Sequence, residues 1–396
     1  MERIGIYTGT FNPVHLGHLR AARYAREALR LDRVLLIPDG LTPHKTLPRN
    51  SPTGQQRLDM LTLCLETEEG LTCSDMALCR EGVSYTWQTV TRIREAFPDA
   101  ELFLLMGSDM LDNLHQWRGV EEIFRNAAVA VLCRGEKDEQ TRLQENRKRL
   151  ESMGARVIVL ENPITAISST QLRRMLVFRC ASEFIPEKVR QYIYENGLYG
   201  TDRNYRDLPL EEQEQVVISL LKENRVKHVL GCRQAAVELA RLHGADETDA
   251  ARAALLHDIT KALDGPLQLT LCREYGTMLD EFSQKNPKTL HALTGSLVAE
   301  RIFGENKAVV EAICCHTTGK ANMNPLEKII YVADYMEPNR DFPGVEELRR
   351  LAYTDITQAL ALGLRMTLDM LKEQGREISP ESQEALRFLH DERGAL

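Results

Sequence analysis

The fold of the first half of this chain is decided by the stretch Gly9-Thr10-Phe11-Asn12-Pro13-Val14-His15-Leu16-Gly17-His18. It follows a β-rich run, residues 4–7, and leads into an amphipathic segment, which predicts a strand, a tight turn and a helix. His15 and His18 are three residues apart and would share one face of that helix. Free backbone N–H groups and the positive end of the helix dipole attract phosphate there. The stretch therefore predicts a phosphate site, although an isolated histidine pair is more simply explained as two capping or surface residues.

Short β-rich runs alternate with helix-length segments from residue 1 to about residue 200. The candidate strands span residues 4–7, 33–38, 101–107, 128–134 and 156–160. Such alternation predicts a Rossmann-like α/β domain with a parallel sheet and right-handed crossovers. Ligands of such sheets bind beyond the carboxyl ends of the strands. We therefore expect the chemistry in the loops after Tyr7, Pro38, Gly107 and Leu160.

The sequence changes in character after Gly200. Residues 201–209 begin with a polar, aperiodic stretch, and we expect them to form a linker that packs tightly against neither core. Helical periodicity follows over residues 211–223, 234–242, 250–257, 289–303, 306–316 and 346–371. The 396 residues thus predict two domains, the α/β domain over residues 1–200 and an all-α bundle over residues 210–396.

Composition narrows the classes of function. The net charge of −8 gives no long-range attraction to nucleic acid. No apolar run approaches the roughly 20 residues of a membrane span, and the chain opens on a strand-like segment without a signal-peptide core. The nine cysteines show no Cys-x-x-Cys pair or disulfide spacing, so we expect reduced and mostly buried thiols. A cytoplasmic location follows as the expectation, with a homo-oligomer left open.

Several further segments resemble the nucleotidyltransferase superfamily that carries an H-x-G-H signature, and within it the bacterial nicotinate-mononucleotide adenylyltransferases. The resemblance covers roughly residues 1–200. The matching segments, besides His15 to His18, are residues 37–38, 42–45, 57–61, 84–86, 107–111, Trp117, 121–124 and 167–173. The H-x-G-H signature alone marks the superfamily, whereas the whole set is specific. Thr8 and Thr42 depart mildly from the usual glycine and proline.

This resemblance implies attack by the 5′-phosphate of nicotinate mononucleotide on the α-phosphorus of ATP, with Mg²⁺ carried on the nucleotide. His15 and His18 would hold the ATP phosphates, and Lys45 and Arg173 would add cationic contacts. The further implied substrate contacts are Gly9, Thr10, Phe11, Tyr85, Thr86, Gly107, Asp109, Trp117, Ser168, Ser169 and Thr170. Ser168 to Thr170 look like a helix N-cap that cradles phosphate, and Trp117 offers a stacking face to the pyridine ring. The simpler alternatives are plain packing for Trp117 and a helix cap for Asp109.

The second half contains a set of metal-ligand residue types in helical context. They are His228, His257, Asp258, His291, His316 and Asp334. Apolar residues precede both His257 and Asp334, and a carboxylate after such a run is costly to bury unless it is paired or bound to metal. One histidine on an apolar face is usually a core residue, but six ligand-type residues favour a metal centre.

This half resembles the HD superfamily of metal-dependent phosphohydrolases, and more closely the branch that hydrolyses diadenosine tetraphosphate symmetrically. Matching segments are residues 225–231, 255–261, 316–319 and 333–340. The resemblance implies one or two transition-metal ions, iron first and manganese as an alternative, because imidazole and carboxylate occur without thiolate. Asp258 would bridge two ions, with His228, His257 and Asp334 on one and His291 and His316 on the other. Lys261 on the same helix face, with Thr318, Gly319 and Arg340, would hold substrate phosphate.

Three alternatives stay open. The first half could belong to another H-x-G-H transferase such as a pantetheine-phosphate adenylyltransferase, although Trp117 and residues 84–86 argue against it. The helical half could hydrolyse a different nucleotide. It could also be a metal-holding nucleotide sensor without catalytic activity, although the full ligand set and Lys261 favour an enzyme.

Overall fold

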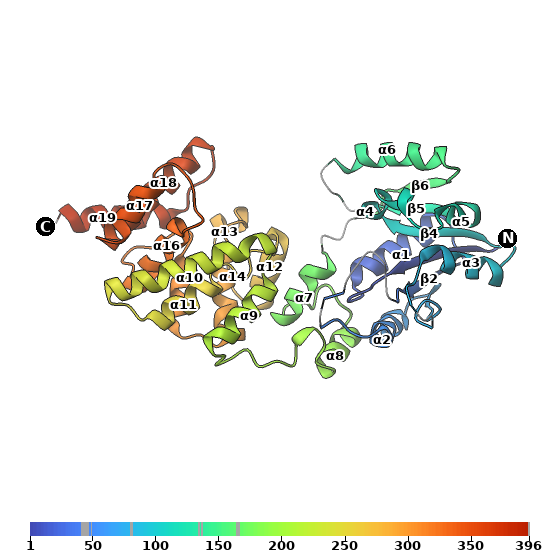
Figure 1. Ribbon diagram of the computed structural model, residues 1–396, viewed down its shortest axis with the longest axis horizontal. Coiled ribbons are helices and arrows are strands. Elements are labelled where there is room, and N and C mark those ends of the chain that lie inside the picture. The colour runs from blue at the N-terminus through green and yellow to red at the C-terminus, as the bar shows by residue number, and fades with distance from the viewer. Residues whose placement is uncertain are drawn as a thin grey trace. The chain divides into compact units, whose positions relative to one another are not determined.

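The computed structural model describes residues 1–40, 47–48, 50–79, 82–133, 135, 138–163 and 167–394. The chain forms two compact units, Met1–Arg203 and Asn204–Leu396. Figure 1 shows the sheet of the first unit and the helices of the second.

The first unit is built on a six-stranded sheet in the order β3-β2-β1-β4-β5-β6, and every neighbouring pair is parallel. The strands are β1 (Arg3–Gly9), β2 (Arg33–Pro38), β3 (Leu71–Cys73), β4 (Glu101–Gly107), β5 (Ala128–Leu132) and β6 (Val157–Leu160). The predicted Rossmann-like fold is confirmed.

Helices cover both faces of this sheet (Figure 1). They are α1 (Leu16–Ala28), α2 (Gly54–Leu65), α3 (Thr86–Ala96), α4 (Ser108–Leu111), α5 (Val120–Asn126), α6 (Glu139–Ser152), α7 (Ser169–Val177) and α8 (Glu187–Glu195), with short 3₁₀ turns at Leu114–Gln116 and Leu198–Gly200. The strand order runs one way from β1 to β3 and the opposite way from β4 to β6. Right-handed crossovers therefore place α1 and α2 on one face and α3, α5 and α6 on the other.

Burial follows this arrangement. Ile4 and Ile6 of β1 are fully buried in a cluster with Val90 and Ile93 of α3 and Ile123 of α5. The strand order reverses between β1 and β4, and these two strands end at Gly9 and Gly107. A crevice that binds ligands opens at such a reversal, so we expect the site at the loops after these two glycines.

The strand predictions differ from the structure at two places. Strand β3 was missed, because three residues at a sheet edge carry too little periodicity to be recognised. Strand β5 ends at Leu132, two residues before the predicted boundary, and Arg134 lies outside the described residues.

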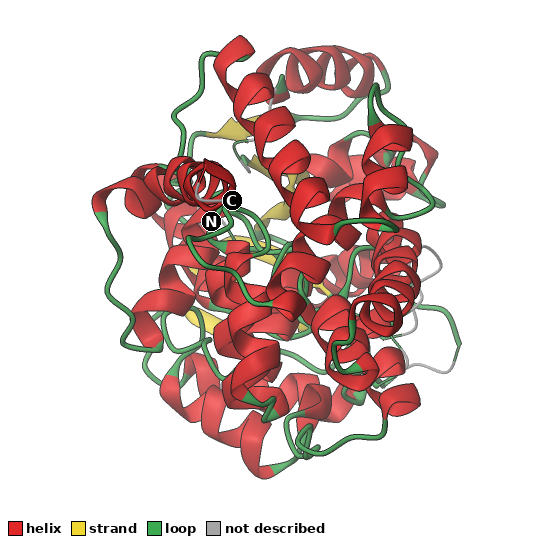
Figure 2. Cartoon of the chain, turned by 90° about the vertical axis from the view of Figure 1, so that its left-hand side faces the viewer, coloured by secondary structure: helices red, strands yellow, loops and turns green. Residues whose placement is uncertain are grey.

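The second unit contains only helices and loops over residues 204–394, the part of it that the structure describes. Figure 2 distinguishes the helices, in red, from the strands of the first unit, in yellow. The helices are α9 (Leu210–Leu220), α10 (Glu223–His243), α11 (Glu247–Leu256), α12 (Gly265–Glu274), α13 (Glu281–Lys285), α14 (His291–Val298) with a π-helical extension (Ala299–Phe303), α15 (Lys307–Cys315), α16 (Pro325–Met336), α17 (Val345–Ala352), α18 (Ile356–Glu373) and α19 (Pro380–Gly394). The predicted all-α architecture is confirmed.

Three predicted helical segments had the wrong boundaries. The helix predicted over residues 346–371 is broken between α17 and α18, because Asp355 starts a new helix by accepting hydrogen bonds from the N–H groups of Thr357 and Gln358. The segment over residues 211–223 ends at Leu220, and the predicted segment 234–242 is the end of the longer α10.

Residues 201–209 are also more ordered than predicted. Thr201 is buried, and its hydroxyl donates to the carbonyl of Leu198 at 2.9 Å. Tyr205 contacts the Phe303 ring, and the Arg252 guanidinium donates to the Leu208 carbonyl at 3.0 Å. The expectation of a loosely packed linker was wrong here, because polar and aromatic side chains can anchor a connection to the unit that they adjoin.

Two compositional expectations can be compared with the structure. All nine cysteines lie in the described part of the chain as free thiols, and five of them are buried. Among the described residues, no helix combines the length and the apolar character that crossing a bilayer requires.

Candidate active sites

The two histidines of the first unit lie together at the start of α1. His15 is the N-cap residue and is only 6% exposed, and its backbone N–H donates to Nδ1 of His18 at 3.3 Å. The two rings have centroids 3.8 Å apart and planes 35° apart. The buried Phe11 packs its ring edge-on to His18 at 5.0 Å. The two residues form a capping box at the start of α1, so the capping alternative describes their local geometry, whereas the surface alternative does not fit the buried His15.

Two arginines hold the loop between β1 and α1 through its carbonyl groups. Arg57 is 3% exposed, and its Nη1 donates to the Thr10 carbonyl of this loop at 2.7 Å. Its Nη2 donates to the Asp39 carbonyl after β2, also at 2.7 Å. Arg173 donates from Nη1 to the Asn12 carbonyl at 2.8 Å and from Nη2 to the Thr170 hydroxyl at 3.0 Å. Desolvation lowers the pKa of both guanidinium groups. The arginines thus fix the loop backbone and bring positive charge beside the histidine pair, and sequence reasoning had given Arg57 no role.

Asn12 is a second residue of this loop that sequence reasoning left without a role. It is 2% exposed, and its Nδ2 donates to the Ser51 hydroxyl at 2.9 Å. Its Oδ1 is buried without a hydrogen-bond partner among the described residues. A buried acceptor without a hydrogen bond costs free energy, so we expect a donor from a ligand or a water molecule to bind this oxygen.

Ser168 is the N-cap residue of α7, and its hydroxyl accepts from the Gln171 N–H at 3.2 Å. Ser169 and Thr170 form the first turn, where backbone N–H groups are free of helical partners. Arg173 joins this turn to Asn12, so the two helix starts, α1 and α7, are linked within one unit. Thr42 and Lys45 lie outside the described residues.

Gly107 ends β4 and is itself the N-cap of α4, which places Asp109 in the first turn. The alternative that Asp109 caps the helix was therefore wrong. The parallel pairing of β1 with β4 brings the loops after Gly9 and Gly107 to the same edge of the sheet. Asp109 thus lies just after β4, at the same edge of the sheet as the histidine loop.

The remaining predicted contacts of the first unit lie on adjoining segments. Tyr85 is the N-cap of α3, and the Arg118 guanidinium lies 5.2 Å from the centre of its ring. Gly119 packs so closely on Trp87 that an added Cβ would come within 2.5 Å of the indole, and its φ is +70°. The loop that carries Trp117 is thereby held against the start of α3, where Tyr85 and Thr86 lie. Trp117 is partly buried and packs against the core, so its role in packing and a role in stacking on a ligand are both compatible with its place.

In the second unit, the six ligand-type residues come from five segments, and the four histidines among them surround the Asp258 carboxylate. Its Oδ2 lies 3.7 Å from Nε2 of His228 and 3.5 Å from Nε2 of His257. Its Oδ1 lies 3.5 Å from Nε2 of His291 and 3.9 Å from Nε2 of His316. Each oxygen therefore faces its own pair of imidazoles.

Asp334 adds a second carboxylate on one side only. Its Oδ1 lies 3.0 Å from Nε2 of His228 and 3.8 Å from Nε2 of His257. Burial would raise the pKa of Asp334, but its hydrogen bond with His228 and the nearby Arg340 guanidinium outweigh this and hold it well below its usual value. The His228 side of the centre thus has two carboxylates within reach, and the His291 side has one.

The Nδ1 atoms of all four histidines face away from this centre. Those of His257, His316 and His291 lie 2.7, 2.7 and 2.9 Å from backbone carbonyls, and that of His228 lies 3.2 Å from the Glu337 carboxylate. A proton held on Nδ1 leaves the Nε2 lone pair for a metal. Burial lowers the pKa of His257 and His291 well below the usual value and that of His316 to about 4, so these imidazoles are neutral at pH 7.

The donor set fits a divalent metal. Nε2 of His316 is buried and makes no hydrogen bond within the described part of the chain. Two overlapping groups have ligand atoms within 4.8 Å of one another: His228, His257 and Asp334, and His257, Asp258 and His316. Neutral imidazoles with carboxylates and without thiolate suit first-row ions, but the set does not distinguish iron from manganese.

Three cationic side chains lie between these ligands and solvent. Arg225 pairs with Oδ2 of Asp258, Arg340 donates to Asp334 Oδ1 at 2.8 Å, and Lys261 Nζ lies 2.7 Å from His291 Nε2. They are 25%, 34% and 39% exposed, whereas Asp258 is 1% exposed. Desolvation lowers the pKa of Lys261 to about 8. Lys261 lies in a turn after α11, so the predicted helix was wrong there, but its Nζ does lie on the side of Asp258, 3.7 Å from Oδ1. Arg225 had no role in the sequence-based prediction.

Among the described residues, no contact joins Thr318 or Gly319 to the metal ligands. The Thr318 hydroxyl donates to the Glu381 carboxylate at 3.0 Å, and Gly319 packs against Leu364 and Ala385. The preceding Thr317 has a buried hydroxyl without a partner among the described residues. Thr317 thus has a buried polar atom without a described partner directly after the ligand-type residue His316.

Both halves have relatives among known proteins. The cytidylyltransferase-like family matches residues 6–175, and the HD domain family matches residues 225–339. A probable nicotinate-nucleotide adenylyltransferase of Neisseria meningitidis is 37% identical over 203 residues, which are 50% of this chain and 99% of the relative. A symmetrical bis(5'-nucleosyl)-tetraphosphatase of Halalkalibacterium halodurans is 41% identical over 169 residues, which are 42% of this chain and 90% of the relative.

A crystal structure described as a predicted HD superfamily hydrolase involved in NAD metabolism, from Clostridium acetobutylicum, is 35% identical with a TM-score of 0.46. The match covers 47% of this chain and 98% of the chain in the crystal structure. With its histidine pair at the reversal of the sheet and its histidine and aspartate cluster in the helical unit, the chain belongs to the cytidylyltransferase-like family in its first half and to the HD domain family in its second.

Proposed function

We propose that the first unit transfers the adenylyl group of ATP to nicotinate mononucleotide, giving nicotinate adenine dinucleotide and pyrophosphate. The observation that carries this proposal is the packed pair of His15 and His18 at the start of α1, beside the point where the strand order reverses. The relative from Neisseria meningitidis supports the choice of acceptor.

In this reaction a phosphate oxygen of the acceptor forms a bond to the α-phosphorus of ATP while the bond to pyrophosphate breaks. The protein contributes position and charge rather than a nucleophile. His15 and His18 contact the phosphates, and the start of α7 supplies free N–H groups. Arg57 and Arg173 fix the loop between β1 and α1 through its carbonyl groups. Mg²⁺ arrives on the nucleotide. The Trp117 loop and the start of α3 form the side of the site that selects the pyridine ring.

The test is product chromatography of the full chain with ATP and each of two acceptors, nicotinate mononucleotide and phosphopantetheine. We expect nicotinate adenine dinucleotide with the first and no product with the second. Transfer to phosphopantetheine alone would support the other H-x-G-H transferase that the sequence left open.

For the second unit we propose metal-dependent hydrolysis of diadenosine tetraphosphate to two ADP. The convergence of four Nε2 atoms on the two oxygens of Asp258 carries this proposal. The relative from Halalkalibacterium halodurans supports the symmetrical cut. His228, His257, Asp258 and Asp334 would hold one divalent ion and Asp258, His291 and His316 a second, with iron as the first choice and manganese as the second.

The metal pair, when bound, supplies a water that is acidic enough to be deprotonated near neutral pH and neutralises phosphate charge. The protein residues position the substrate around it. Arg225, Lys261 and Arg340 lie at the solvent side of the ligands, where a polyphosphate would enter. Thr317 offers a hydroxyl next to His316. Attack at the β-phosphorus breaks the central P–O–P bridge, and each half leaves as ADP.

The test is chromatography of products from the metal-loaded full chain with a panel of dinucleotide polyphosphates. We expect ADP alone from diadenosine tetraphosphate. AMP together with ATP would place the attack at an α-phosphorus and overturn the symmetrical cut. No turnover of any member of the panel, with metal bound, would favour the nucleotide sensor.

A further inference from the structure

His228 differs from the other three ligand histidines in how its Nδ1 is held. His257, His291 and His316 each use a carbonyl three residues earlier, at a helix end or in a turn. His228 lies inside α10, where the preceding carbonyls already accept helical hydrogen bonds. Its Nδ1 therefore needs a partner from elsewhere in the unit, and Glu337 Oε1 lies 3.2 Å from it.

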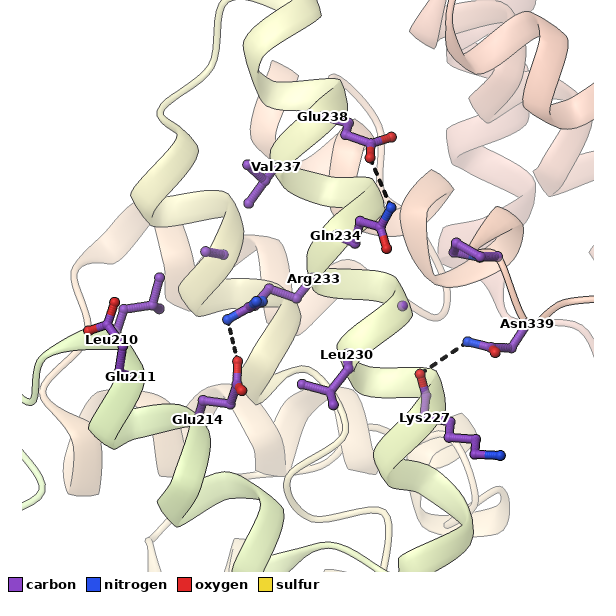
Figure 3. Close-up of a pocket in the computed structure, with 13 residues that line it drawn as sticks. Leu210, Glu211, Glu214, Lys227, Leu230, Arg233, Gln234, Val237, Glu238 and Asn339 are labelled. Atoms are coloured by element: carbon purple, nitrogen blue, oxygen red, sulfur yellow. Dashed lines mark hydrogen bonds and ion pairs between the residues drawn. The ribbon is translucent and has the colours of Figure 1, made fainter.

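The Glu337 carboxylate is held firmly in this place. It is 1% exposed, and its Oε2 accepts from the backbone N–H of Asn339 at 2.7 Å and from Asn339 Nδ2 at 2.8 Å. Asn339 Nδ2 also lies 3.1 Å from the carbonyl of Lys227 (Figure 3). Asn339 therefore connects the Glu337 carboxylate to α10. One oxygen of Glu337 is thus fixed by Asn339, and the other is left for His228.

Gly231 leaves the room that this carboxylate needs. It lies in the interior of α10, where glycine is disfavoured. An added Cβ would lie 2.2 Å from Glu337 Oε2 and 2.8 Å from Asn339 Nδ2. Gly231 also lines a groove of about 850 Å³. Lys227 and Asn339 line the same groove (Figure 3). None of the six metal-ligand residues lines that groove, so it is distinct from the metal centre.

We propose that Glu337 is a positioning residue that fixes the His228 imidazole and strengthens metal binding at the half of the centre formed by His228, His257 and Asp334. A carboxylate on Nδ1 orients the ring and makes Nε2 a more basic ligand than a neutral carbonyl does. In the other half, formed by Asp258, His291 and His316, the nearest described partners of the histidine Nδ1 atoms are carbonyls, and no described carboxylate contacts them. The two halves therefore differ in affinity. This inference rests on the two-ion centre of the proposed hydrolase.

The experiment is a calorimetric titration of the chelator-treated full chain with Co²⁺. We expect two binding events for the wild type. Glu337→Gln should weaken one event about 10- to 100-fold and leave the other unchanged, because the amide lacks the charge and cannot satisfy both His228 and Asn339. Gly231→Ala retains the glutamate but displaces its carboxylate, so it should weaken the same event even if Glu337→Gln folds poorly.

The assignment to one half is tested in the Asp334→Asn background. There the affected site is already impaired, so adding Glu337→Gln should change Co²⁺ binding little further. Glu327→Gln is the matched control, because Glu327 is an equally buried glutamate of α16 that pairs with Lys320 and not with a ligand histidine. Both binding events should survive in it.

Unchanged binding in Glu337→Gln would overturn the proposal, as would parallel weakening of both events in Glu337→Gln and Glu327→Gln. A wild type that binds a single ion unaffected by Glu337→Gln would also overturn it, while the hydrolase proposal would stand on its products. A wild type that binds no Co²⁺ would overturn the positioning role together with the metal centre. Hydrolysis products are read separately, so failure of the proposed substrate does not alter the titration.

Discussion

The His15 ring lies against the His18 ring, with centroids 3.8 Å apart, at the first turn of α1. Two imidazoles at this distance can both contact one phosphate group, and the Phe11 ring packs against His18 at 5.0 Å. The arrangement is suited to stabilising charge that develops on phosphate oxygens in the transition state.

His18→Ala should lower the turnover of adenylyl transfer by about 10²–10³-fold, because it removes a preorganised group that contacts the reacting phosphates. The measurement is the steady-state rate of nicotinate adenine dinucleotide formation at saturating substrates. His390→Ala, an exposed histidine of α19, is the control and should leave this rate unchanged. Near-normal turnover in His18→Ala would remove the histidine pair from the mechanism.

Trp117→Ala should raise KM for nicotinate mononucleotide several-fold to tenfold, since a stacked aromatic contributes about 1 kcal/mol. KM for ATP should change much less, because the indole serves only the pyridine ring. Both constants are measured with the other substrate saturating. An equal rise for both substrates would mean that Trp117 acts by packing the loop against α3.

Asp258→Asn should lose both bound ions and all hydrolysis together. The reason is that the amide has one acceptor oxygen and no charge, whereas Asp258 faces an imidazole pair with each of its two oxygens. Metal analysis and hydrolysis assays of the purified full chain measure the two losses. Adenylyl transfer by the same preparation is the internal control and should persist. A metal-replete, active variant would contradict the bridging role.

The metal-free protein should lose stability as the pH falls from 7 to 5.5. The pKa of His316 is about 4 in the folded chain and about 6.5 when unfolded. Between these values the unfolded chain binds a proton that the folded chain does not, so the free energy of unfolding decreases as the pH is lowered. Burial lowers the pKa of His257 and His291 as well, which acts in the same direction.

Urea unfolding at pH 7 and pH 5.5, in the presence of a chelator, measures this dependence. His316→Gln cannot take up the proton in either state and should show a smaller difference between the two pH values. A variant with the same pH dependence as the wild type would show that His316 is not buried in neutral form.

The sequence by itself determined the two architectures and most of the candidate residues. Alternating strands and helices required a parallel sheet, and the histidine stretch after β1 fell at the strand end where such a sheet binds ligands. In the helical half, the six ligand-type residues were recognisable because carboxylates and imidazoles after apolar runs are costly without partners. These features are local in the chain, or follow from the burial of single residues.

Only the tertiary structure decided what supports these residues. Arg57 reaches carbonyls after β1 and β2, Glu337 reaches His228 from 109 positions away, and Arg225 pairs with Asp258 across 33 positions. It also decided that the Thr318 hydroxyl donates to the Glu381 carboxylate, 63 positions away. Hydrogen bonds depend on distance and direction within about 3 Å. A sequence pattern predicts which face of a helix or strand is buried. It does not predict which side chain of a distant element contacts that face.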